Sequence, residues 1–225
     1  MSPAVPNLFA PKSSRVVRAL LVNAGRKWSE REIAKTTGVS TGTAHYVCTR
    51  LLEFRYLARD ENNRITLIDP LRLLNRWAAY HQFDIANSFL QYHTFEREIE
   101  KVTQEIARID LEYAATVLTG AWLVAPYVRP VDLYFYSRDE DTARRIATKM
   151  ELRPIPKGGN IRFVIPYDQG VFYGSQILKG VKVVSNVQLY VDLYNFSARG
   201  EEAASRLLQV ILEEWQARRR SSQHV

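Results

Sequence analysis

The sequence contains very little cysteine and lacks several familiar patterns, and each absence excludes a class of protein. Its 225 residues include one cysteine, Cys48, so no disulfide can form within the chain and a reduced, cytoplasmic setting is expected. No apolar stretch approaches the roughly 20 residues that a membrane-spanning helix needs. Residues 1–11 lack a basic start followed by an apolar core, so no signal peptide is expected. One cysteine and four histidines also exclude the usual zinc fingers and ribbons.

The remaining composition is that of a folded protein, but its charge is unevenly distributed. Hydrophobic residues make up 46% and charged residues 24%, which excludes a disordered or fibrous chain. Residues 1–80 contain 13 Lys and Arg against 6 Asp and Glu, whereas residues 81–225 contain 18 of each sign. The whole net charge of +7 therefore lies in the first third. A basic segment joined to a neutral one is typical of a nucleic-acid-binding domain that carries a second module.

The first part of the chain shows start and stop signals of short helices. We expect residues 1–12 to form a loose tail and residues 13–80 to form one domain. Ser13 or Ser14 would cap a first helix, and Gly25 would end it.

The signals of the second and third helices are clearer. Ser29 followed by Glu32 is the pattern of a capping box, in which each side chain accepts a hydrogen bond from the backbone of the other residue. Gly38 suits the left-handed position that ends the second helix. Ser40 would cap a third helix that runs to about Phe54.

Small and apolar residues lie where the second and third helices would cross. Ala34, Gly38, Val39, Ala44 and Val47 have the spacing of a helix-turn-helix motif. Its small residues let the two helices approach closely, while the valines fill the space beneath them.

A β-hairpin is expected after the third helix. Residues 56–58 and 65–68 are β-prone, and the polar residues 59–64 between them suit a turn. A further helix would begin at Asp69-Pro70. The sequence therefore predicts a winged helix-turn-helix domain.

The outward face of the third helix predicts a DNA-binding site. An α-helix fits the major groove, and its amino-terminal residues reach base edges and phosphates. Gly42 costs roughly 1 kcal/mol of helix propensity relative to alanine, which favours close approach of DNA at this position. The tip of the hairpin would enter the adjacent minor groove. The alternative for any one of these side chains is that it is simply solvated. The residues predicted to contact DNA are Lys27, Arg31, Ser40, Thr41, Thr43, His45, Tyr46, Thr49, Arg50, Asn62, Asn63 and Arg64.

Residues 81–112 are expected to form a connector helix. Apolar residues recur at intervals of three and four, which is typical of one apolar helical stripe. This stripe would pack on a neighbouring domain or on a second subunit, so a homodimer remains open. Its members are Phe95, Ile99, Val102, Ile106 and Ile109.

Residues 113–225 have the pattern of a small α/β domain, which makes the expected fold class α+β. Strands are expected at 114–118, 131–136 and 160–165, with short β-prone runs within 171–184. Helices are expected at 121–128, 139–151, 187–194 and 200–218. The aromatic and basic residues Tyr167, Phe172, Tyr173, Lys179 and Lys182 raise a second nucleic-acid surface as an alternative to core packing.

One part of this domain is similar to the nucleotidyltransferase fold. The turn Thr119-Gly120-Ala121-Trp122 precedes a strand that carries Asp132. Nucleotidyl transfer needs two metal ions held by carboxylates, but the alternate position on this strand is Tyr134. We therefore expect a degenerate, catalytically silent version of this fold, with no catalytic residue, no metal and no cofactor. His45 and Cys48 have a ligand-like spacing without further ligands, so no metal is expected there either.

Two segments of this domain resemble a known family. Residues 184–194 read Val-Ser-Asn-Val-Gln-Leu-Tyr-Val-Asp-Leu-Tyr, and residues 199–204 read Arg-Gly-Glu-Glu-Ala-Ala. With the turn at 119–121 and the expected winged helix, they resemble the AbiEi antitoxins of type IV toxin–antitoxin, or abortive infection, systems. The resemblance extends over residues 13–215. Helix packing explains most of the motif, and Arg199 would bind a ligand or pair with Asp192 or Glu202.

The resemblance implies a function in bacterial gene regulation. The protein would bind double-stranded DNA at repeats near its own promoter and repress its operon. The C-terminal domain would counteract a nucleotidyltransferase toxin without forming a stable complex with it. Two alternatives are a nucleotidyltransferase with a DNA-binding appendage and a winged-helix module that binds protein.

Overall fold

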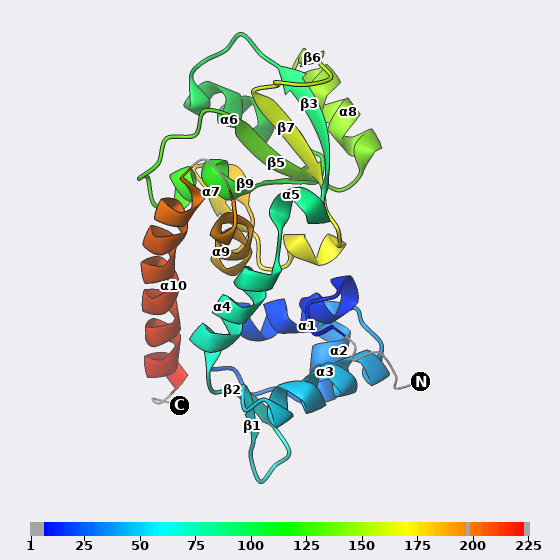
Figure 1. Ribbon diagram of the computed structural model, residues 1–225, viewed down its shortest axis with the longest axis vertical. Coiled ribbons are helices and arrows are strands. Elements are labelled where there is room, and N and C mark those ends of the chain that lie inside the picture. The colour runs from blue at the N-terminus through cyan, green and yellow to red at the C-terminus, as the bar shows by residue number, and fades with distance from the viewer. Residues whose placement is uncertain (1–6, 197–198, 223–225) are drawn as a thin grey trace.

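Three helices, a β-hairpin and a fourth helix form the amino-terminal end of the protein. The computed structural model describes residues 7–196 and 199–222. We call residues 7–80 the helical unit, which lies at the lower end of Figure 1. Its elements are α1 (Pro11–Val22), α2 (Glu30–Thr37), α3 (Thr41–Glu53), β1 (Leu57–Arg59), β2 (Ile65–Leu67) and α4 (Pro70–Tyr80).

Helix α1 differs at both ends from the helix expected from the sequence. It begins at Pro11 rather than after Ser13 or Ser14, because proline has no N–H to satisfy and its fixed φ suits the first helical position. The Ser14 hydroxyl lies inside the helix and donates to the carbonyl of Pro11 at 2.7 Å. The helix ends at Val22, before the predicted Gly25.

The predictions for α2, α3 and the hairpin are confirmed. Ser29 and Glu32 form both hydrogen bonds of a capping box, and Gly38 ends α2 in the left-handed conformation at φ 64°. Ser40 caps α3 by accepting from the backbone N–H of Thr43 at 3.1 Å. Strands β1 and β2 pair antiparallel, with Leu57 opposite Leu67.

The rest of the described chain, residues 81–196 and 199–222, is the sheet unit. Its seven strands have the order β6-β3-β7-β5-β4-β9-β8. Strands β5 and β7 are parallel, as are β4 and β9, whereas β3 is antiparallel to both β6 and β7. The strands are β3 (Ser88–His93), β4 (Tyr113–Ala115), β5 (Leu133–Ser137), β6 (Arg153–Pro154), β7 (Ile161–Ile165), β8 (Gln176–Leu178) and β9 (Val181–Val183).

The prediction of one connector helix over residues 81–112 is wrong. This segment instead contains the short helix α5 (Phe83–Ala86), strand β3 and helix α6 (Ile99–Ala107). Only Ile99, Val102 and Ile106 of the apolar stripe are helical. Ile109 lies beyond the end of α6, and the Phe95 side chain lies in a loop, 69% exposed. Residues 88–93, which precede the stripe, form a strand because they pair with β6 on one side and β7 on the other.

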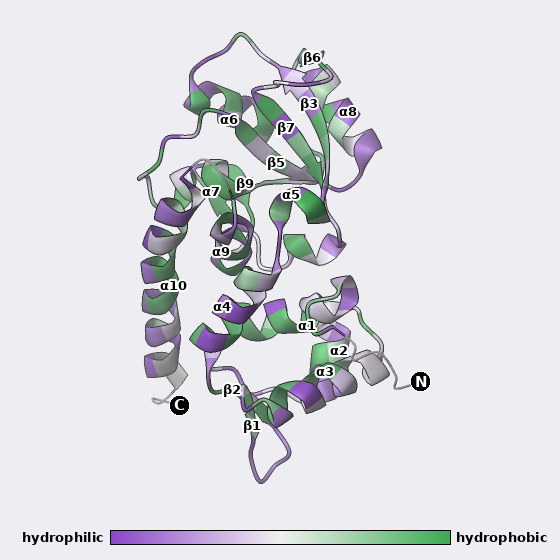
Figure 2. Cartoon of the chain, viewed as in Figure 1, coloured by the Kyte–Doolittle hydropathy of each residue, from purple (hydrophilic) through white to green (hydrophobic). Residues whose placement is uncertain are grey.

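The remaining helices belong to the sheet unit. They are α7 (Val117–Val124), α8 (Glu140–Lys149), the 3₁₀ helix η1 (Gln169–Phe172), α9 (Asn186–Tyr194) and α10 (Gly200–Ser222). Helix α10 runs along one side of the molecule from α7 down to the helical unit (Figure 1). Its outer face is hydrophilic, and its hydrophobic face is turned toward the protein (Figure 2).

Helix α7 begins earlier than its sequence suggests. The predicted strand 114–118 ends at Ala115, and the predicted helix 121–128 occupies Val117–Val124. The run Ala114 to Leu118 is apolar and contains β-branched residues, which favoured a strand. Val117 starts the helix at φ 37°, which is unusual for a β-branched residue. The architecture is thus mixed α+β, and no described helix is both long and apolar enough to cross a membrane.

Candidate nucleic-acid interface

Helix α3 has one buried face and one accessible face. Ala44, Val47, Cys48 and Leu51 are fully buried, as the sequence predicted. Burial raises the pKa of the Cys48 thiol to about 12, so this thiol is an inert part of the core. The opposite face is the predicted DNA-contacting one: its exposed members are Ser40, Thr41, Gly42 and His45, and its half-buried members are Thr43, Tyr46, Thr49 and Arg50.

The hairpin tip is shaped by one aspartate. Asp60 Oδ1 accepts from the backbone N–H groups of Asn62 and Arg64, at 3.1 and 2.9 Å. Asn63 adopts φ 60°, a left-handed conformation that asparagine tolerates in turns. Asn62 and Asn63 are therefore held exposed at the tip, where the sequence had placed them.

Glu30 connects the hairpin to α3. Its Oε2 lies 2.9 Å from His45 Nδ1, and its Oε1 accepts from Arg59 Nη2 at 2.6 Å. Arg59 also donates to Asn63 Oδ1 at 2.6 Å. Burial alone would raise the pKa of Glu30, but the hydrogen bonds from Arg59 and His45 outweigh it and the pKa is lowered. Sequence reasoning missed Glu30 and Arg59, because the capping box and the turn explained them without any contact between them.

Carboxylates also hold other predicted DNA-binding cations. Lys27 Nζ lies 3.0 Å from Asp60, and Arg64 Nη1 lies 3.0 Å from Glu32. Backbone hydrogen bonds, from Arg64 to Asp60 and from Ser29 to Glu32, are the main reason that the pKa values of both carboxyl groups are lowered. Arg50 pairs with Glu53 on α3 at 2.6 Å. These cations are pre-positioned in local ion pairs rather than freely extended.

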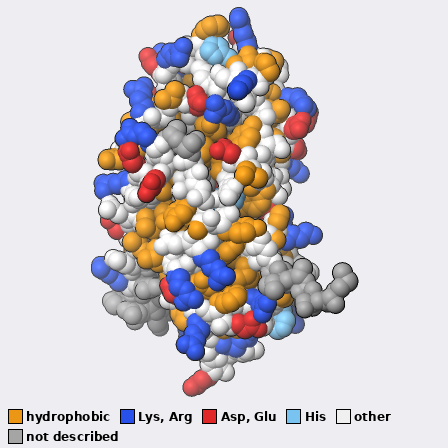
Figure 3. Space-filling view, in the orientation of Figure 1, with side chains coloured by type: hydrophobic (Ala, Val, Ile, Leu, Met, Phe, Trp, Pro, Cys, Tyr) orange, Lys and Arg blue, Asp and Glu red, His pale blue; other side chains and the backbone are white. Residues whose placement is uncertain are grey.

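All twelve predicted residues lie on one end of the molecule, on α2, α3, the hairpin and the segments that join them. Arg31 is exposed on α2. Lys and Arg side chains lie at this end, with Asp and Glu side chains among them (Figure 3). The structure thus brings together residues that the sequence spreads over positions 27 to 64.

Asp132, the predicted remnant of a metal site, is held by an arginine. It pairs with Arg162 at 2.8 Å, and the same guanidinium lies over the ring of Tyr134 at 5.0 Å. The described residues contain no group of three or more His, Cys, Asp or Glu side chains that would hold a metal ion. The position that a second carboxylate would need is filled by a buried tyrosine.

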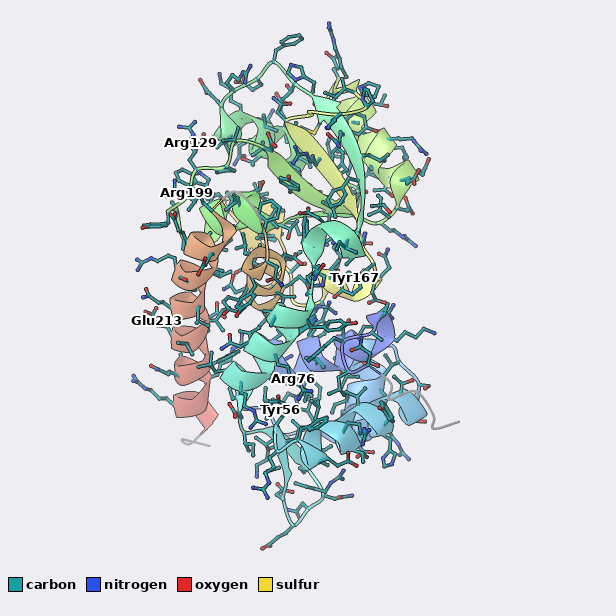
Figure 4. All side chains as sticks on the ribbon, in the orientation of Figure 1. Tyr56, Arg76, Arg129, Tyr167, Arg199 and Glu213 are labelled. Carbon is teal, nitrogen blue, oxygen red and sulfur yellow. The ribbon has the colours of Figure 1, made fainter. Side chains whose placement is uncertain are left out.

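The motif turn at 119–121 has a packing explanation. A Cβ atom on Gly120 would lie 2.5 Å from Leu189 of α9 and 3.1 Å from the carbonyl oxygen of Ala115. Helices α7 and α9 therefore approach closely only because this position is glycine. Arg199 pairs with Glu202 at 2.5 Å, one of the two partners expected, and lies near the top of α10, far from the hairpin (Figure 4).

A buried polar cluster joins the two units. Arg18, Gln188 and Asp192 each have a relative exposure of 0%. Arg18 Nε donates to Gln188 Oε1, and Gln188 Nε2 donates to Asp192 Oδ1, both at 2.7 Å. Tyr167, which lies where the sheet unit meets α1 (Figure 4), accepts from Arg18 Nη2 at 2.8 Å.

The aromatic residues considered for a second nucleic-acid surface are partly engaged by the same junction. Besides Tyr167, the Tyr173 hydroxyl accepts from Asn23 Nδ2 at 2.9 Å. Lys182 lies over the ring of Phe172 at 5.6 Å. These aromatic groups contact other parts of the protein, which favours the packing alternative.

Comparison with known proteins identifies a family. A family model described as a transcriptional regulator, the AbiEi antitoxin of a type IV toxin–antitoxin system, matches residues 66–213. No curated protein and no solved structure gives a match. The matched segment runs from β2 into α10 and includes the turn at 119–121 and the α9 motif. The chain belongs to the AbiEi antitoxin family of transcriptional regulators.

Proposed function

We propose that this family member binds double-stranded DNA through a winged helix-turn-helix formed by residues 13–80. Helix α3 would be the recognition helix in the major groove, and the hairpin would be the wing beside it. The observation that carries the proposal is that α3 and the hairpin lie at the same end of the protein and are joined by Glu30. This residue contacts His45 of α3 and Arg59 of the hairpin. This linkage fixes the spacing of the two elements that would enter neighbouring grooves.

The roles of the side chains follow from their chemistry. The exposed amino-terminal turn of α3, with Ser40, Thr41 and Gly42, allows close approach to phosphate and base edges. His45 would face the bases, and Arg50 would contact phosphate. When DNA binds, phosphates would replace Glu53 and the other carboxylates as partners of the paired cations.

In the cell we propose that the chain represses its own operon as the antitoxin of a type IV system. The sheet unit would counteract a nucleotidyltransferase toxin without a stable complex. Where a nucleotidyltransferase gene neighbours the gene for this chain, co-expression should restore growth while the two proteins elute separately on gel filtration. Growth arrest that persists despite full expression of this chain would contradict the antitoxin role.

DNA binding is tested by fluorescence anisotropy with a duplex from the upstream region of its own gene and a scrambled duplex of equal composition. We expect clearly tighter binding to the upstream duplex. Variant His45→Ala should reduce this preference, whereas Arg144→Ala on the distant helix α8 should not. Equal, weak binding of the wild type to both duplexes would contradict the proposal.

A further inference from the structure

Helix α1 is shared between the two units. It packs against α2 and α3 of the helical unit and also against α9 and η1 of the sheet unit. In Figure 1 it lies between the hairpin end and the sheet. The position of α1 therefore determines how α3 is oriented relative to the sheet unit.

Three buried polar side chains make the central contact between α1 and the sheet unit, and we call them the relay: Arg18, Gln188 and Asp192. The amide of Gln188 presents its oxygen to Arg18 and its nitrogen to Asp192, so it lies between a buried cation and a buried anion. The Arg18 guanidinium also lies over the ring of Trp77 in α4, 5.0 Å from the ring centre. Both charges are removed from water and depend on this arrangement.

The Asp192 carboxylate contacts several further side chains. Its Oδ2 accepts from Thr116 at 2.6 Å, and its Oδ1 accepts from Tyr136 at 3.2 Å. His81 Nε2, just beyond α4, lies 3.3 Å from Oδ1, an ion-pair distance without hydrogen-bond alignment. The carboxylate of α9 thus joins the N-cap of α7 and strand β5 to His81 at the end of α4.

A second ion pair reinforces the same face of α1. Arg15 binds Asp168 with two parallel hydrogen bonds, each 2.7 Å long. Asp168 also caps η1 by accepting from the backbone N–H of Gly170. A Cβ on Gly170 would lie 2.7 Å from Arg18 Nη1 and 2.8 Å from Arg15 Cγ, so any larger residue here would require the two arginine side chains to shift.

Contacts of this kind define an orientation more narrowly than apolar packing does. Apolar surfaces tolerate sliding, whereas hydrogen bonds weaken steeply when their angles change. A buried charge that loses its partner is strongly disfavoured. Arg18 reaches both of its hydrogen-bond partners across the junction, Gln188 and Tyr167, when the two units keep the observed relative placement.

We propose that Arg18, Gln188 and Asp192 are positioning residues that hold the helical unit in a single orientation on the sheet unit. The motif segment of α9 thereby affects DNA recognition at a distance, because it fixes the orientation of α3 relative to the sheet unit. This inference deepens the proposed function and rests on it for its consequence at DNA, but the orientation itself is measurable without DNA.

The test measures the distance between the units in the full chain. Spin labels are placed on Thr36→Cys in α2 and Asp141→Cys in α8, both of which are exposed positions on helices. The native Cys48 is fully buried and stays unlabelled. Electron–electron resonance should give a single narrow distance distribution for the otherwise wild-type chain.

Two variants remove the relay in different ways. Gln188→Met keeps the side-chain size and removes both hydrogen bonds. Arg18→Met combined with Asp192→Asn removes both charges together, so neither is left buried alone and the chain keeps its fold. Asp132→Asn, which breaks a surface ion pair within the sheet unit, is the matched control. Circular dichroism is used to check that each variant is folded.

We expect the single narrow distribution to be lost in both relay variants and retained in Asp132→Asn. Relay variants that melt at lower temperature but keep the narrow distribution would overturn the proposal, because the residues would then contribute stability alone. Binding of the upstream duplex is measured in parallel. If the wild type shows no preference for that duplex, the proposed function fails, while the distance distributions still decide the role of the relay.

Discussion

Single side chains at the hairpin end are held by local carboxylates. Glu30, Glu32 and Asp60 each contact cations that come from other elements or turns. Such exposed pairs contribute little to stability, because water and salt screen them. Under the proposed function, these pairs place cations where DNA phosphates would meet them.

Arg50 is predicted to contact one phosphate. Arg50→Ala should weaken binding to all duplexes by a similar factor and reduce the slope of log affinity against log salt by about 1. Arg144→Ala is the matched control, because Arg144 also pairs with a carboxylate on its own helix, Glu140 at 2.6 Å. An unchanged salt slope for Arg50→Ala would remove Arg50 from the interface.

Glu30 gives the hairpin end a defined acid response. Its folded-state pKa lies below the ordinary value of 4.5, so its contacts stabilise the folded state above that value and are lost as the pH falls through the lowered pKa. Carboxyl NMR titration should place the midpoint below 4.5. In Arg59→Ala the midpoint should move upward. A wild-type midpoint at or above the ordinary value would contradict the Glu30 contacts.

Cys48 is predicted to be unreactive in the folded protein. Burial raises its pKa to about 12, so almost no thiolate is present at neutral pH. A thiol reagent such as DTNB should react with it only after unfolding in denaturant. Rapid stoichiometric reaction of the native protein would show that α3 does not pack as described.

At the scale of elements, local signals predicted the structure well wherever one residue fixes a backbone conformation. The capping box at Ser29 and the left-handed Gly38 placed α2 correctly. The prediction for residues 81–112 failed because strand β3 depends on partners in β7 that are more than 60 residues away, such as Val164 opposite Phe89. No local pattern carries that information.

The two glycines near α3 should respond oppositely to alanine. Gly38→Ala should lower the free energy of unfolding by about 1 kcal/mol, because alanine is strained at φ 64°. Gly42→Ala should raise it by up to about 1 kcal/mol, since a Cβ there meets nothing nearer than Ser40 Oγ at 3.9 Å. Urea denaturation measures both changes.

Gly42→Ala also tests the approach of DNA. The variant should bind the upstream duplex more weakly although it is more stable, because the added methyl group occupies the surface next to the DNA. Unchanged affinity would show that the duplex does not come close to this turn of α3.

At the scale of the whole molecule, the uneven charge and the α9 motif pointed to a two-part regulator, and the family match supports that reading. The junction was not predictable from sequence. Arg18 looks like an ordinary helix residue, and its partner Gln188 lies 170 positions away. Only the folded chain shows that a motif ascribed to helix packing holds a buried charge relay.

DNA binding by the helical unit is the central claim, and its dependence on salt tests it most directly. Anisotropy titrations of the wild type with the upstream duplex are repeated across a salt series. With six to ten phosphate contacts, affinity should fall by about 10³-fold or more between roughly 50 and 200 mM salt, with a slope of about −5 to −9. An affinity that barely changes with salt would contradict DNA binding by this surface.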